Sequence, residues 1–176
     1  MIVGNDVIDL THQKYIFRQF SCHRLNKKIF NLQELALVNK EAVTTSLRRW
    51  TIKESVYKAY QRLYQLKPRF NPVSIHTDII DEELSFGLIQ GHKFKLQTHQ
   101  NHKMIYTSIF DQLSSVSITY SSKKDLSKKL SDYFLIGPIA ICKDRNNIPS
   151  IIIVNGYKPI SLTHHGRFQI AQFNPL

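Results

Sequence analysis

Two acidic residues and one lysine could together bind a metal ion and a phosphate. Asp6 lies within an apolar run, residues 2–10, where a carboxylate is costly unless it is paired, hydrogen-bonded or bound to a metal. Glu54 and Lys58 are four residues apart, so on a helix they would share one face. Because Mg²⁺ prefers one or two carboxylates together with phosphate oxygens, this pair suits a magnesium ion beside a phosphate.

A third stretch, residues 161–167, combines hydroxyl groups, imidazoles and a guanidinium, which suit the binding of an anion. Each stretch also has an ordinary structural interpretation. Asp6 could be satisfied by backbone donors at a strand end, Glu54 and Lys58 could form an exposed ion pair, and residues 161–167 could be a polar turn. Taken singly, none of the three stretches indicates a function.

The longest predicted helix, residues 46–65, would position the acidic and basic pair. Trp50, Tyr57 and Tyr64 recur there every seven residues, which favours an amphipathic helix. A shorter helix is expected to begin after Asn31, with Glu34 completing a capping box. Further helices are expected over 12–28 and 122–134, and strands over 2–10, 73–80, 94–97, 104–110, 116–120, 151–154 and 168–173.

The composition is that of an ordinary globular chain with an excess of positive charge. The 176 residues suit one domain, and 42% of them are hydrophobic. A net charge of +11 indicates a polyanionic partner, although charge alone leaves nucleic acid, anionic lipid, a phosphorylated cofactor and an acidic protein open. We expect a cytoplasmic protein without a membrane segment, because no signal peptide opens the chain and its apolar runs are too short to cross a bilayer. Two cysteines, Cys22 and Cys142, are expected to be reduced.

In this chain order, the three stretches resemble the motifs of the 4′-phosphopantetheinyl transferase superfamily. The family pattern has Gly-x-Asp in the first strand, a helix with an aromatic residue followed by Lys-Glu-Ala/Ser and a later Lys, and a late Ser-x-Ser-His. The matching segments are 4–6, 50–58 and 161–164. The chain departs from the pattern at Asn5, where an apolar residue is usual, and at Thr163, which replaces the second serine.

The order of the motifs resembles the short holo-acyl-carrier-protein synthase type of the family. This resemblance implies an α+β fold, with an antiparallel sheet packed against a long signature helix in a single domain over 1–176. Because the short type is usually smaller, an insertion is expected within 86–134. Short members are commonly homotrimers that share the site between chains, so His164 of one copy could act beside Asp6 of another.

The resemblance also implies a reaction, the Mg²⁺-dependent transfer of the 4′-phosphopantetheine arm of coenzyme A to a serine of an acidic apo carrier protein. The other product would be 3′,5′-ADP. Asp6 and Glu54 would hold the metal, and Lys58 would neutralise the phosphates. Lys53 would contact a phosphate or organise Glu54. Either Glu54 or a metal-bound water could take the proton of the serine.

The late motif would bind the other end of coenzyme A. Ser161 and His164 are expected to contact its phosphates, and Arg167 could assist them. Asp9 lies three residues after Asp6, so it could act on the metal through a water. The sequence does not identify the carrier, which could belong to fatty acid synthesis, polyketide synthesis or a dedicated pathway.

Other functions agree less well with the sequence. A common nuclease motif requires Glu-x-Lys, whereas Ser55 and Val56 follow Glu54. A basic, non-catalytic module that binds nucleic acid or a carrier protein would explain the charge but not the ordered motifs. Nucleic acid is therefore the less favoured partner. A zinc site could only be assembled from His99, His102 and Cys142, with no second spaced pair.

Overall fold

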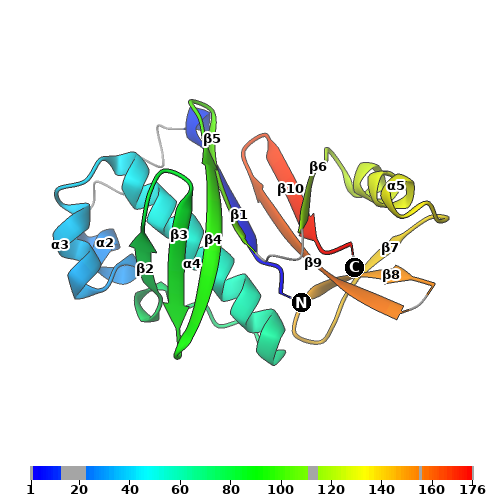
Figure 1. Ribbon diagram of the computed structural model, residues 1–176, viewed down its shortest axis with the longest axis horizontal. Coiled ribbons are helices and arrows are strands. Elements are labelled where there is room, and N and C mark those ends of the chain that lie inside the picture. Colours follow the sequence, from blue (N-terminus) through cyan, green and yellow to red (C-terminus); the bar gives the residue numbers. More distant parts are fainter. Residues whose placement is uncertain (1, 13–22, 111–114, 155, 176) are drawn as a thin grey trace.

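The protein has an α+β fold built on two five-stranded antiparallel sheets that lie side by side (Figure 1). The computed structural model describes residues 2–12, 23–110, 115–154 and 156–175. The α+β class expected from the sequence is therefore confirmed, but two sheets are present where one was expected. No helix in the described ranges is both long and apolar enough to cross a membrane.

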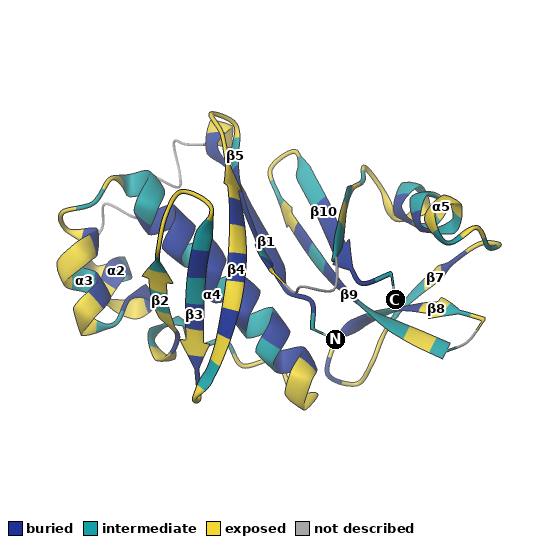
Figure 2. Cartoon of the chain, in the orientation of Figure 1, coloured by how far each residue is buried: buried dark blue, intermediate teal, exposed yellow. Residues whose placement is uncertain are grey.

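The first sheet packs one face against the longest helix, α4 (Val43–Tyr64). Its strand order is β1-β5-β4-β3-β2. The strands are β1 (Asn5–Asp9), β2 (His76–Ile79), β3 (Leu84–Ile89), β4 (His92–Gln100) and β5 (Met104–Ile109). Ile52, Val56 and Ala59 on α4 are buried against Leu96 and Ile109 of the sheet. Burial alternates along β4, as expected for a strand with one covered face (Figure 2).

The second sheet is covered by a shorter helix, α5 (Lys123–Phe134). Its strands, in the order β6-β10-β9-β8-β7, are β6 (Val116–Thr119), β7 (Ala140–Lys143), β8 (Pro149–Ile153), β9 (Gly156–His165) and β10 (Phe168–Phe173). Leu126 and Leu130 of α5 are buried in one cluster with Ile151, Ile160 and Phe173 of this sheet. Ser122 accepts a hydrogen bond from the backbone of Asp125 and caps the helix, close to the predicted start.

The two sheets repeat one topology. In each, the first strand pairs with the fifth, the remaining strands follow in the order fourth, third and second, and the main helix lies between the first two strands of the sequence. The insertion expected within 86–134 falls on β3 to β5, β6 and α5. These elements form the interior of the first sheet and the beginning of the second.

Local sequence signals located several elements well. The capping box of Asn31 and Glu34 is confirmed at the start of α3 (Leu32–Val38). Gln90 and Gly91 form the turn between β3 and β4, and both have a positive φ, of 49° and 80°. Of the helix expected over 12–28, the described part is α2 (His23–Ile29), and the rest lies outside the described residues.

The aromatic stripe of α4 is not its main buried face. Ile52, Val56 and Ala59 are fully buried, whereas Tyr64 is 43% exposed. Trp50 and Tyr57 instead pack beside the helix, where both rings contact Phe70. The seven-residue spacing therefore predicted the helix correctly but not the face that meets the sheet.

Two short 3₁₀ turns complete the described chain. They are η1 (Leu10–His12) and η2 (Pro72–Ser74), and α2 packs near η2. The strand expected over 73–80 therefore begins only at His76, because η2 occupies its first residues.

Side chains of the second sheet bind the backbone of β1 and join the two sheets. The amide of Gly4 donates to Gln172, that of Asn5 to Ser161, and that of Asp9 to His165, at 3.0, 3.2 and 3.0 Å. Asn5 and Asp9 are four residues apart, as are their partners on β9, so β1 and β9 run in the same direction.

Candidate active site

Asp6, Lys58 and Thr163 form a compact polar cluster between the two sheets. Lys58 Nζ lies 3.0 Å from Asp6 Oδ1 and donates to the carbonyl of Asn5 at 2.9 Å. Thr163 Oγ1 donates to the same Asp6 oxygen at 2.8 Å. Asp6 comes from β1, Lys58 from α4 and Thr163 from β9, so three distant segments of one chain meet at one carboxylate.

Gly4 explains how Asp6 reaches the helix. A Cβ atom at this position would lie 2.3 Å from the carbonyl oxygen of Ser55 and 2.9 Å from atoms of Ala59. Only glycine therefore lets β1 approach the backbone of α4 so closely. Because side chains alternate along a strand, Asp6 then turns to α4 while Asn5 and Val7 turn to the second sheet.

Glu54 brings a second carboxylate to the cluster from the same helix as Lys58. Burial and the negative charge of Asp6 raise the pKa of Glu54 to about 7, against the opposing effect of Lys58. Among the described residues no hydrogen-bond donor to its carboxylate is found. Two carboxylates with one nearby ammonium group leave negative charge uncompensated, which a bound cation would relieve.

The two carboxylates therefore fit a magnesium ion that takes its other ligands from phosphate or water. They do not form a complete protein cage. In the described part of the chain, no group of three or more His, Cys, Asp or Glu side chains is arranged to hold a metal. The alternative zinc set is not assembled either, because His99 lies on β4 of the first sheet and Cys142 on β7 of the second.

A cavity of about 440 Å³ opens beside this cluster. Asp6, Glu54 and Lys58 line one part of it, and its apolar wall includes Trp50, the single tryptophan of the chain. Residues of α2 and β9 complete the lining, among them Leu25, Ile29, Leu162, Thr163, His164 and His165.

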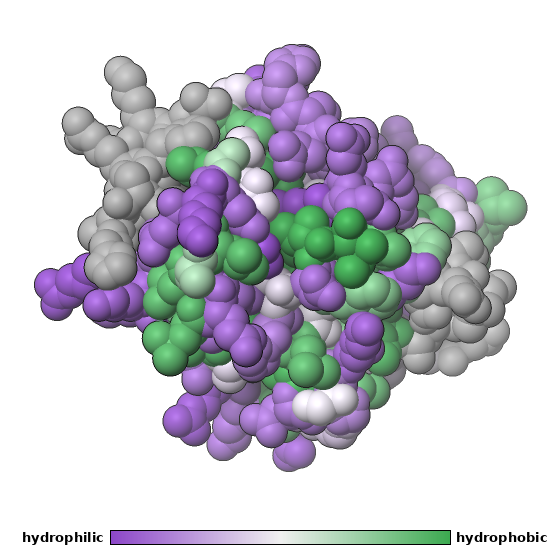
Figure 3. All heavy atoms as spheres, turned by 60° about the vertical axis from the view of Figure 1, so that its left-hand side comes forward, coloured by the Kyte–Doolittle hydropathy of each residue, from purple (hydrophilic) through white to green (hydrophobic). Residues whose placement is uncertain are grey.

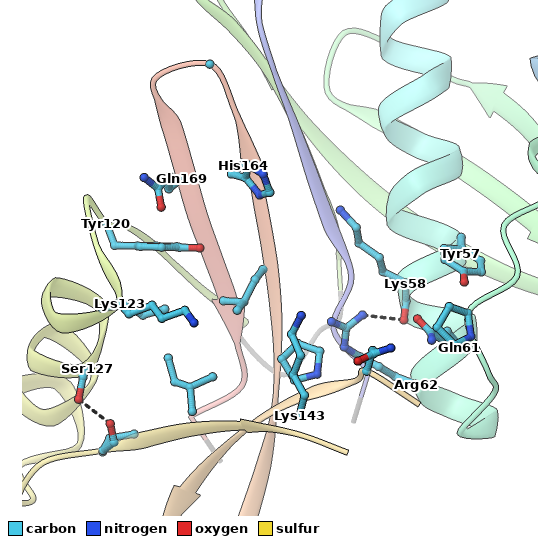
Figure 4. Close-up of a pocket in the computed structure, with 18 residues that line it drawn as sticks. Tyr57, Lys58, Gln61, Arg62, Tyr120, Lys123, Ser127, Lys143, His164 and Gln169 are labelled. Atoms are coloured by element: carbon cyan, nitrogen blue, oxygen red, sulfur yellow. Dashed lines mark hydrogen bonds between the residues drawn. The ribbon is translucent and has the colours of Figure 1, made fainter. Parts of the chain in front are cut away.

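A larger cavity of about 800 Å³ adjoins it and shares Lys58, Leu162 and His164 with it. Figure 4 shows Lys58 and Arg62 on α4 across from Tyr120 and Lys123, with His164 on β9 between them. Lys143 adds another cation from β7. No carboxylate is found among the described residues that line this cavity, so its lining favours an anion.

Arg62 makes the wall of the larger cavity electropositive. Its guanidinium donates to the carbonyls of Ile160 and Lys58, and no salt bridge to it is found among the described residues. Burial lowers its pKa to about 10, because a buried cation without a carboxylate partner is poorly solvated. The carbonyls hold Arg62 in place, and its charge remains available to attract an anionic ligand.

The structure does not bring Lys53 to this cluster. Its side chain is fully buried, and Nζ lies 2.7 Å from Glu34 of α3. Nζ also donates to the carbonyls of Pro72, at 2.9 Å, and Ile75. Lys53 therefore ties α4 to α3 and η2, and it lines neither of the two cavities.

The side chains of the late motif, residues 161–164, point in two different directions. His164 lines both cavities, as a phosphate ligand would require. Ser161 is fully buried and its oxygen accepts the amide hydrogen of Asn5, so it faces β1 instead of a cavity. Successive residues of a strand point to opposite faces, so Ser161 and His164 cannot both face the same side of β9.

Asp9 and Arg167 contact one another at the far end of β1. Arg167 Nε lies 3.4 Å from Asp9 Oδ2, and the Arg167 amide donates to the same oxygen at 3.2 Å. Neither residue lines the cavities beside Asp6. Most of the polar stretch 161–167 forms the end of β9. Only its last residues form a turn, the one that leads into β10, so the turn interpretation holds for them alone.

The sequence reasoning missed several residues of the larger cavity. Tyr120, Lys123 and Lys143 come from the second sheet and its helix, and no motif marks them. Arg62 could have been found, since it follows Lys58 by one helical turn. Thr163 was noted only as a replacement for serine, although its hydroxyl is the group that reaches Asp6.

A sequence model of one protein family, the 4′-phosphopantetheinyl transferase superfamily, matches residues 2–120. The matched range contains Asp6, Glu54 and Lys58 and covers more than half of the chain. No curated protein and no solved structure gave a match.

Proposed function

The chain belongs to the 4′-phosphopantetheinyl transferase superfamily, and on this premise we propose that it transfers the phosphopantetheine arm of coenzyme A to a serine of an apo carrier protein. The observation that carries the proposal is the cluster of Asp6, Glu54 and Lys58 beside a cavity lined by cations. Attack on a pyrophosphate requires carboxylates that can hold a hard cation. It also requires cationic or polar groups, such as ammonium and imidazole, that can bind the phosphates.

In the proposed reaction, the serine oxygen of the carrier forms a bond to the phosphorus that bears pantetheine. The bond from this phosphorus to the bridging oxygen breaks, and 3′,5′-ADP leaves. Asp6 and Glu54 would hold Mg²⁺, which when bound supplies positive charge to the pyrophosphate oxygens. Lys58 binds the phosphates and Thr163 orients Asp6. Glu54 would accept the serine proton, since its carboxylate lines the cavity beside Lys58, where the phosphates would bind.

The larger cavity would receive the nucleotide part of coenzyme A. Its volume of about 800 Å³ is in the range of cofactor sites, and Lys123, Lys143 and Arg62 can neutralise phosphates there. His164, which lines both cavities, would contact the phosphates where the two cavities meet. Ser161 has no part in this contact, since its hydroxyl is engaged with Asn5.

The carrier would approach over α2, which forms a wall of the smaller cavity. Arg24, Lys27 and Lys28 of this helix are exposed, and Leu25 and Ile29 face the cavity. The side of the molecule that carries α2 and α3 is largely hydrophilic, with separate apolar patches (Figure 3). A basic rim of this kind suits an acidic carrier, whose encounter rate it would increase. Carriers of fatty acid synthesis are the first to test.

One chain would suffice for one site. Asp6 and Thr163 meet within the same chain, so a homotrimer is not needed to bring the early and late motifs together. We propose that the protein combines the motif order of the short holo-acyl-carrier-protein synthase type with two five-stranded units of the same strand order in one chain. Cys142 is a half-buried free thiol, which agrees with a cytoplasmic location, and Cys22 lies outside the described residues.

An intact-mass assay tests the proposal. The protein, coenzyme A and Mg²⁺ are mixed with a panel of apo carriers, and the carrier is expected to gain one phosphopantetheine arm while 3′,5′-ADP appears in equal amount. Asp6→Asn and Glu54→Gln should abolish the gain. Glu82→Gln removes an exposed carboxylate from the turn before β3 and should leave it unchanged.

A folded protein that modifies none of the carriers would contradict the proposal. It would favour a basic module that binds nucleic acid or a carrier without turnover. Binding measured with and without Mg²⁺ at increasing salt then identifies the nucleic-acid module, because its affinity would fall steeply with salt and would not require the metal.

A further inference from the structure

Asp9 is a buried carboxylate that has no role in the proposed reaction. Its side chain is only 1% exposed. Oδ1 accepts hydrogen bonds from the amide and the hydroxyl of Thr11, at 2.9 and 2.6 Å, and Oδ2 faces the amide and Nε of Arg167. Burial alone would raise its pKa, but these donors hold the pKa of Asp9 below its ordinary value. A charged group with this many partners has a structural task.

These contacts tie the end of β1 to the turn between β9 and β10. Besides the hydrogen bond from the Arg167 amide and the ion pair with its guanidinium, the Asp9 amide donates to His165 Nδ1 at 3.0 Å. Gly166 has a φ of 56°, and a Cβ there would lie 2.6 Å from Asp9 Oδ2. The turn therefore rests directly on the Asp9 carboxylate.

The turn follows the residues of β9 that complete the site. Thr163 and His164 lie two and one residues before His165, and Thr163 donates to Asp6. In the described part of the chain, β1 forms ladder pairs with β5 only, so side chains alone hold β9 in register with β1. Ser161 and Gln172 make such ties at the start of β1, and Asp9 makes them at its end.

We propose that Asp9 is a positioning residue, whose carboxylate holds the turn between β9 and β10 against β1 and so keeps Thr163 and His164 beside Asp6. The link to catalysis rests on the proposed function, but the tie itself does not. Loss of the carboxylate charge should loosen the turn and shift the late motif relative to Asp6, while both sheets stay folded.

Amide hydrogen exchange in Asp9→Asn tests the tie without turnover. We expect exchange at residues 163–168 to rise by about tenfold, since a hydrogen bond to a charged group is lost. Arg167→Ala keeps the backbone amide that donates to Asp9 and should change exchange much less. Asp81→Asn is the matched control, because Asp81 accepts the amides of Glu83 and Leu84 at a turn remote from the site. It should loosen only its own turn.

Two functional measurements accompany exchange. Acrylamide quenching of Trp50, which lines the cavity, should increase in Asp9→Asn and not in Asp81→Asn. The kcat/KM for carrier modification should fall by about tenfold in Asp9→Asn, mainly through kcat. Unchanged exchange at 163–168 would overturn the tie. Raised exchange with unchanged kcat/KM would overturn the positioning role. If the wild type transfers nothing, the proposed function fails. The positioning of the late motif is then judged by exchange and quenching alone, and an unchanged value of either in Asp9→Asn would overturn it.

Discussion

Thr163 and Asp6 are 157 residues apart in sequence and are joined by a hydrogen bond of 2.8 Å. The bond crosses from the second sheet to the first and ends on the carboxylate oxygen that Lys58 also contacts. Thr163 of the second sheet and Lys58 of α4 therefore both hold the Asp6 carboxylate in place. The replacement of the usual serine keeps the one group, a hydroxyl, that this contact requires.

Thr163→Val should lower kcat/KM for carrier modification by about tenfold, because it removes a hydrogen bond to a charged group while keeping the side-chain shape. Thr163→Ser keeps the hydroxyl and should stay near the wild-type value. Steady-state kinetics at several Mg²⁺ concentrations measure both variants. Equal kcat/KM values for the valine and serine variants would contradict the role of the hydroxyl.

Gly4→Ala should destabilise the protein by about 1–3 kcal/mol, the usual cost of overpacking. The added Cβ would meet the carbonyl of Ser55, so β1 must move away from α4 and take Asp6 with it. Thermal unfolding and transfer activity should both fall. Gly137→Ala is the control, since a Cβ there meets open space. A Gly4→Ala variant as stable and active as this control would show that the close approach is unnecessary.

Lys53→Met should reduce stability by about 3–5 kcal/mol, because it leaves Glu34 buried without its cation. The second change Glu34→Gln in the same chain should recover part of the loss. Denaturant unfolding measures both, and activity is expressed per folded molecule. If Lys53→Met stays as stable as the wild type but loses turnover, Lys53 acts on the substrate and its assignment to the fold is wrong.

Stability should fall as the pH drops through about 6.5, the ordinary pKa of histidine. Burial lowers the pKa of His165, and its Nδ1 must stay unprotonated to accept the Asp9 amide. The unfolded chain therefore binds the proton more readily than the folded one. His165→Asn offers an oxygen acceptor that does not titrate, so thermal unfolding between pH 7.5 and 5.5 should vary less than in the exposed control His102→Asn. An identical pH dependence in both would contradict this contribution.

The helix-borne part of the site could be predicted from sequence because helical spacing fixes which side chains are neighbours. Glu54 and Lys58 lie four residues apart, and both line the smaller cavity with Asp6. Lys53 was grouped with them through the Lys-Glu motif of the family that the sequence resembles. Successive helix residues point in different directions, and Lys53 contacts Glu34 instead. Glu34 itself was predicted, as a capping residue.

The strand-borne part could not be predicted in the same way. Which face of β9 meets the cavity depends on how the second sheet packs on β1, and no local pattern reports this. The structure places His164 in the lining of both cavities, whereas Ser161, three residues earlier, accepts the amide hydrogen of Asn5 on β1. The equal strand order of the two sheets likewise becomes visible only in the folded chain, because no repeat in the sequence marks it.

The most direct test of a site complete within one chain is complementation between two inactive variants. Asp6→Asn and His164→Ala are each assayed alone and then as an equimolar mixture unfolded and refolded together, with wild type alongside. We predict that refolded wild type is active and that the mixture regains no transfer activity, because native Asp6 and native His164 must belong to the same chain. In an oligomer that shares the site between chains, about a quarter of the sites would contain both native residues. Recovery of transfer toward that fraction would contradict the account.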